Sequence, residues 1–80
     1  MKNLERITFN TQIMGGKACI RGMRVTVSAV VSMVGSGHSF DEILAAYPYL
    51  ELEDIKQSLR YAAWRVQEID IPINMAAWKY

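Results

Sequence analysis

The sequence predicts a mainly α fold, in which a three-helix core with a helix-turn-helix layout lies between a short N-terminal β element and an apolar C-terminal arm. Two observations carry this prediction. Apolar residues repeat with helical spacing in three segments after Thr26, and residues that start or stop helices separate those segments. Eighty residues suffice for one small domain. We divide it into the β element with a glycine-rich basic loop (1–25), the helical core (26–69) and the arm (70–80).

The β element begins where polar and apolar residues of β-favouring types alternate, so we expect a strand over residues 6–9. Cys19-Ile20 and Arg24-Val25 could pair with this strand, or with each other around Gly22. Gly15-Gly16 supplies the turn, because glycine tolerates the left-handed backbone that tight turns need.

The first helix follows Thr26, whose hydroxyl is a suitable N-cap. Four valines then repeat at the spacing of a single buried stripe: Val27, Val30, Val31 and Val34. Valine has a modest helix propensity, so tertiary packing must hold this helix. We expect it to end at Gly35-Ser36-Gly37.

The second helix opens with a capping box, Ser39 to Glu42, and Pro48 stops it. Its inward residues are Phe40, Ile43, Leu44 and Tyr47. The third helix starts near Glu51 after a tight turn, and acids in its first turn suit the positive end of the helix dipole. Its long apolar face comprises Leu52, Ile55, Leu59, Ala62, Ala63, Val66 and Ile69.

The C-terminal arm alternates apolar and polar residues, which is typical of a strand-like segment that packs on something. It could pack on its own domain, on a second copy of the chain, or on a partner by β-addition. The residues that would contact a partner are Ile71, Ile73, Met75, Trp78 and Tyr80.

Composition limits the function classes. With 51% hydrophobic and 21% charged residues the chain is too apolar to be disordered. This apolar content is high for a small monomer, so we expect a homodimer or an apolar surface that faces a partner. A single cysteine allows no internal disulfide and fits the cytoplasm, and no apolar run is long enough to span a membrane.

Positive charge is segregated near the N-terminus, although the net charge of +1 does not by itself indicate nucleic acid. No acid lies between Glu5 and Asp41. The cations of the glycine-rich block are therefore candidates for anchoring on the DNA backbone: Lys17, Arg21 and Arg24. The alternative is that they form ordinary ion pairs with Asp41 and Glu42.

The third helix offers candidate readers of base edges, namely Lys56, Gln57 and Arg60. The acids that open this helix oppose that hypothesis, because base contacts normally come from the first turn of a recognition helix. The alternative is a solvated polar face.

We expect no enzyme. Gly15-Gly16-Lys17 lacks the upstream glycine and the following Ser or Thr of a phosphate-binding loop. His38 is the only histidine, and no spacing links it to Cys19 as a catalytic pair. No catalytic residue, metal ligand or cofactor is predicted.

Several motifs together resemble a known family: Met14-Gly15-Gly16-Lys17, Ile20-Arg21-Gly22, Arg24-Val25-Thr26-Val27, Glu42-Ile43-Leu44, Tyr47-Pro48 and Glu53-Asp54-Ile55. Over residues 4–73 the chain resembles the small bacterial domain-of-unknown-function family 433 (DUF433). It departs from that pattern at Thr11 and Ala18, where proline is usual, and at Met23 and Glu51, where threonine is usual.

The resemblance implies a homeodomain-like helix-turn-helix fold and the role of an antitoxin. Such proteins pair with a PIN-like nuclease toxin and repress their own operon. Our hypothesis is therefore that the arm binds and neutralises a toxin, while the basic block and the third helix bind operator DNA as a dimer. The alternative is a protein-interaction module that binds no DNA.

Overall fold

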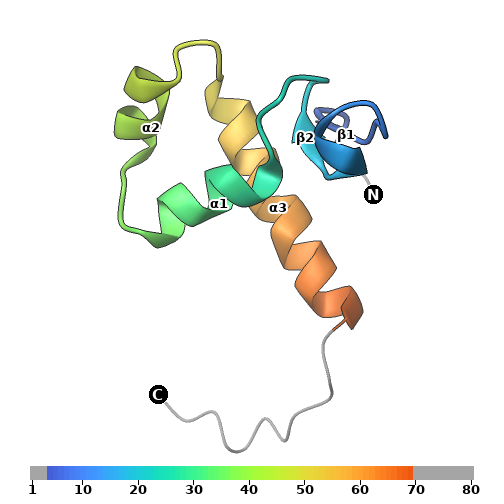
Figure 1. Cartoon of the computed structure of the whole chain (residues 1–80). Helices are drawn as coiled ribbons and strands as arrows, with labels where there is room; N and C mark the ends of the chain where they lie inside the picture. Colours follow the sequence, from blue (N-terminus) through green and yellow to red (C-terminus); the bar gives the residue numbers. More distant parts are fainter. Residues whose placement is uncertain (1–3, 70–80) are drawn as a thin grey trace, which may run out of the picture.

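The structure, a computed structural model, describes residues 4–69 (Figure 1). Its elements in chain order are β1 (Ile7–Thr8), the 3₁₀ turn η1 (Met14–Gly16), β2 (Cys19–Ile20), α1 (Val27–Gly35), α2 (Phe40–Ala46) and α3 (Leu52–Ile69). In Figure 1, α3 runs through the middle of the molecule, with α2 on one side and the β element on the other, and α1 packs across it. The predicted three-helix fold with a short β element is confirmed.

The β element is a two-stranded antiparallel sheet in which Ile7 pairs with Ile20 and Thr8 with Cys19. After Ile20 the chain reverses through Arg21 and Gly22, which both have left-handed backbones (φ +46° and +73°). This reversal lets the Ile20 N–H donate to the Val25 carbonyl at 3.0 Å. Cys19-Ile20 therefore pairs both with β1 and with the segment around Val25.

The helix N-caps formed as predicted. Thr26 Oγ1 accepts the Ala29 N–H at 3.1 Å at the start of α1. Ser39 and Glu42 exchange side-chain to backbone hydrogen bonds at 3.1 and 2.8 Å, which completes the capping box of α2. At the end of α1, Gly37 has the left-handed backbone (φ +95°), so it fills the role that glycine plays after a helix.

The core lies where α1, α2, the β element and the first half of α3 meet. Its buried members are Leu4, Ile7, Ile20, Val27, Val30, Ile43, Leu50 and Ile55. Three residues that we expected on the buried face of α3 are exposed: Leu52 by 43%, Val66 by 55%, and Ala63. The second half of α3 extends beyond the body of the molecule in Figure 1, which leaves Val66 uncovered.

The buried face of α3 is also more polar than its apolar stripe predicts. Alongside Ile55 it buries Asp54, Gln57 and Ser58. Burial of such side chains is tolerated only where each finds a hydrogen-bond partner. The partners come largely from the β element, which packs against this half of the helix.

Candidate interaction surface

A buried carboxylate ties the start of α3 to the β element. The Asp54 side chain is fully buried, and two guanidinium groups bind it. Arg6 Nη1 donates to Oδ1 at 3.0 Å, while Arg21 donates from Nε to Oδ1 at 3.1 Å and from Nη2 to Oδ2 at 2.8 Å. The same carboxylate accepts the Glu51 N–H at 2.8 Å, so it also caps α3.

These contacts shift the pKa values of the participants. Burial by itself raises the pKa of the Asp54 carboxyl, but hydrogen bonds from Arg21, the Glu51 N–H and Arg6 lower it more. The net pKa of Asp54 therefore lies below its ordinary value of 3.8. Hydrogen bonds to the carboxylates raise the pKa values of Arg6 and Arg21. The three groups form a charged, permanently ionised clamp near neutral pH.

Gln57 completes the junction between α3 and the β element. Its Oε1 accepts the Arg6 N–H at 2.9 Å, and its Nε2 donates to Glu5 Oε2 at 2.8 Å. The side chain is 1% exposed. Its predicted place on an exposed, base-reading face of α3 is wrong, because the β element covers this face.

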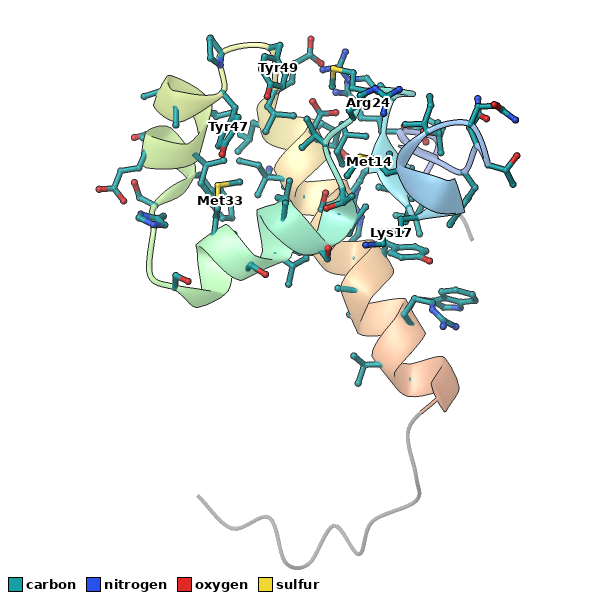
Figure 2. All side chains as sticks on the ribbon, viewed as in Figure 1. Met14, Lys17, Arg24, Met33, Tyr47 and Tyr49 are labelled. Atoms are coloured by element: carbon teal, nitrogen blue, oxygen red, sulfur yellow. The ribbon has the colours of Figure 1, made fainter. Side chains whose placement is uncertain are left out.

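A groove opens between α1 and the second half of α3. We call it the α1–α3 groove; its volume is about 410 Å³, and its lining is Lys17, Ala18, Thr26, Val27, Ser28, Val31, Tyr61, Ala62, Arg65 and Val66. Most of these side chains are apolar, and the cations Lys17 and Arg65 come from two different elements. Figure 2 places Lys17 beside the start of α1, where that helix meets α3.

An aromatic row adjoins the groove. The ring centroids of Phe9 and Tyr61 lie 5.9 Å apart, and those of Tyr61 and Trp64 lie 6.0 Å apart. Phe9 is 54% exposed and Trp64 37%. Because Tyr61 belongs to both the row and the groove lining, the two form one continuous apolar surface on the second half of α3.

The sequence profile of a family described as "Protein of unknown function (DUF433)" matches residues 7–62. The chain belongs to the DUF433 family. It is 40% identical over 58 residues to an uncharacterised protein, y4eO, of Sinorhizobium fredii; the match covers 72% of this chain. The chain spans about a quarter of that relative, since the match covers 26% of it.

A solved structure also resembles this DUF433 chain. The crystal structure of a DUF433 member protein from Anabaena variabilis superposes with a TM-score of 0.72 at 32% sequence identity. The superposition covers 81% of this chain and 64% of the other. The family resemblance inferred from the motifs is therefore confirmed, and so is the mainly helical fold.

The candidate DNA contacts of this DUF433 chain do not gather on one surface. Arg21 is bound to Asp54 rather than to Asp41 or Glu42, the ion-pair partners that we weighed for the basic block. Arg60 forms an ion pair with Glu53 at 2.7 Å. The counter-charge of Arg21 comes from 33 positions along the sequence, so the absence of acids around the basic block does not leave this cation unpaired.

Three candidate cations are exposed without an ion pair to any side chain of residues 4–67: Lys17, Arg24 and Lys56. Figure 2 shows Arg24 near the connection between α2 and α3, whereas Lys17 lies well below it at the start of α1. Lys17 and Arg24, the two cations of the glycine-rich block without an ion pair, therefore lie on separate parts of the surface.

The five candidate partner contacts of the arm fall outside the described residues: Ile71, Ile73, Met75, Trp78 and Tyr80. Sequence reasoning missed both the groove and the aromatic row. The spacing of Tyr61 and Trp64, three residues apart, indicates a shared helix face. No comparable signal links them to Phe9, because that contact joins two distant segments.

Two further side chains of the described residues, His38 and Cys19, could in principle be reactive. His38 Nδ1 lies 3.7 Å from Glu42 Oε1 in an exposed pair, and Cys19 is a buried free thiol. No group of three or more potential metal ligands occurs within residues 4–69. Among the helices of that same range, none has the length and apolarity needed to cross a bilayer.

Proposed function

We propose that this DUF433 protein acts as an antitoxin that binds and neutralises a PIN-like nuclease toxin. The observation that carries the proposal is the continuous apolar surface on the second half of α3. Soluble domains rarely expose joined apolar patches unless a partner covers them. Aromatic side chains such as Tyr61 and Trp64 are enriched at the centres of protein interfaces.

The geometry favours protein binding over base reading by α3. Gln57 is buried, while Arg21 and Arg60 are already paired with carboxylates. Glu53 is also exposed near the start of the helix, where base contacts usually come from, and it would repel phosphate. The alternative of an interaction module without sequence-specific DNA binding therefore has more support than autorepression by this chain alone.

We expect co-expression with a PIN-like nuclease from the same operon to yield one complex in which the nuclease is inactive. Val66→Glu should weaken the complex by about tenfold or more, because a charged group would replace an apolar side chain in the contact and would lose its water on binding. The measurement is the dissociation constant by isothermal titration calorimetry, with ribonuclease activity as the second readout.

Leu52→Glu is the matched control, because Leu52 is another exposed apolar residue of α3 but lies outside the projecting half. It should leave the affinity within about twofold of the original, as expected for a position outside the binding patch. The proposal fails if the nuclease and the chain form no complex, or if both variants bind as tightly as the original protein.

DNA binding by the chain alone should be weak and indifferent to sequence. Fluorescence anisotropy with a duplex from its own upstream region and with a scrambled duplex should give equal affinities. Each lost phosphate contact lowers the salt-dependence slope by about one unit, so Arg21→Ala with Arg24→Ala should lower it by about one rather than two. Tight binding that prefers the upstream duplex would instead establish a repressor.

A further inference from the structure

We infer that the α1–α3 groove binds an amphipathic helix of the partner protein, one whose apolar face is flanked by carboxylates. This inference rests on the proposed function and deepens it, because it names the site and the chemistry of the partner. Two features of the groove carry it: the apolar floor and the positive charge of its lining.

The groove offers a ligand little besides apolar surface. Val27, Val31 and Val66 line it together with Tyr61 and the two alanines. Two of its three hydroxyl groups are already engaged, since Thr26 Oγ1 accepts the Ala29 N–H and lies 3.2 Å from Ser28 Oγ; the third belongs to Tyr61. A ligand that fits must therefore contribute mainly apolar side chains.

The edges of the groove are positive. Lys17 and Arg65 have no ion pair with another side chain of residues 4–67, in contrast to Arg6, Arg21 and Arg60. The first turn of α1, which contributes Val27 and Ser28 to the lining, contains no acid to offset the positive end of its dipole. Carboxylates on the occupant would complement this charge.

The shape favours a helix over other occupants. The groove lies between two helices and is open to solvent, which is the setting in which an amphipathic helix lays its apolar residues. A nucleic-acid backbone would place phosphates over a mostly apolar floor. A small molecule would leave much of its own surface in water.

The charge of the groove decides which partner it suits. Among residues 4–67 the lining contains two cations, Lys17 and Arg65, and no acid. Charge complementarity therefore points to an acidic partner.

The test uses the full chain and two synthetic helical peptides with the same leucine and alanine face. One peptide has glutamates at both ends of that face and the other has lysines. We expect the glutamate peptide to bind about tenfold more tightly, since two exposed ion pairs give a gain of this order. Lys17→Glu with Arg65→Glu should reverse the preference, and added salt should reduce it.

Arg24→Glu with Lys56→Glu is the matched control, because it makes the same change in net charge at exposed cations outside the groove. It should leave the preference for the glutamate peptide intact. Circular dichroism should show that both double variants are folded.

Four results would overturn the inference. The two peptides could bind equally, or the control could reverse the preference as the groove variant does. The glutamate peptide could bind only after residues 70–80 are removed, which would make the chain's own arm the occupant. A dimer in sedimentation experiments that Arg65→Glu dissociates would make the occupant a second copy. If nuclease binding survives any of these results, the proposed function stands while this inference fails.

Discussion

Replacing Asp54 with alanine should lower the free energy of unfolding by about 2–3 kcal/mol, since it removes the charged acceptor that Arg6, Arg21 and the Glu51 N–H share. The carboxylate is fully buried and holds Arg6, Arg21 and the backbone N–H of Glu51. An 80-residue domain has a total stability of roughly 4–12 kcal/mol, so this loss is a large share of it. The measurement is urea denaturation followed by circular dichroism.

Asp41→Ala is the control, because Asp41 is an exposed acid in the first turn of α2. Its loss should change stability by no more than about 0.5 kcal/mol. Asp54→Asn should fall between the two, because the amide oxygen can still accept the Glu51 N–H while the charge is gone. If Asp54→Ala were as stable as the original chain, the contacts of Asp54 with Arg6 and Arg21 would contribute nothing to the free energy of unfolding.

The Asp54 carboxylate also accounts for part of the loss of folding stability at acidic pH. Its pKa in the folded chain lies below the ordinary value of 3.8 that applies to the unfolded chain. The stabilisation that it supplies is therefore complete well above pH 3.8 and is lost as the pH falls through the folded-state pKa. Over that range the unfolding free energy of the original chain should fall more steeply than that of Asp54→Asn.

The comparison of the two pH profiles is not affected by the titration of Glu5, Glu42 and Glu53. Hydrogen bonds from Gln57, the Ser39 backbone and Arg60 respectively lower their pKa values below 4.5. These three carboxyls titrate in the original chain and in the Asp54→Asn variant alike, so the difference between the two pH profiles reports Asp54. Identical profiles would contradict the assignment.

What could be predicted from the sequence depended on how far apart the interacting residues are. Thr26 caps α1 through a residue three positions away, and Ser39 and Glu42 act over the same distance. Such signals lie within a single helical turn, so a pattern of residue types is enough to recognise them.

The clamp could not be found in this way. Asp54 binds Arg21 and Arg6, which lie 33 and 48 positions earlier, and Gln57 binds the Arg6 backbone from 51 positions away. Nothing in the local sequence distinguishes Gln57 from an exposed polar residue of an amphipathic helix. Only the packing of the β element against α3 turns an expected DNA contact into an interior hydrogen bond.

The misplaced apolar residues have a related cause. Ala63 and Val66 fit the stripe of α3 by spacing, but the stripe extends beyond the body, which covers only the first half of the helix. Periodicity predicts which residues share a helix face, but it does not predict whether another element packs against that face. The uncovered end of the stripe is where the candidate interaction surface lies.

Ile20→Ala should be comparably damaging, with a loss of about 2–5 kcal/mol from the removed transfer free energy and the cavity that remains. Ile20 is fully buried and pairs across the sheet with Ile7. Urea denaturation measures the loss, and Ile20→Val should show about 0.5–1.5 kcal/mol at the same site.

The Ile20 and Asp54 substitutions should also be coupled. Arg21 follows Ile20 directly and holds a left-handed backbone, which aims its guanidinium at Asp54. A cavity at Ile20 would loosen this turn and weaken the ion pair beyond it. The double variant of Ile20→Ala and Asp54→Asn should therefore lose less stability than the sum of the single losses, by about 0.5 kcal/mol or more, as neighbouring sites commonly do. Strict additivity would show that the core and the clamp stabilise the β element independently.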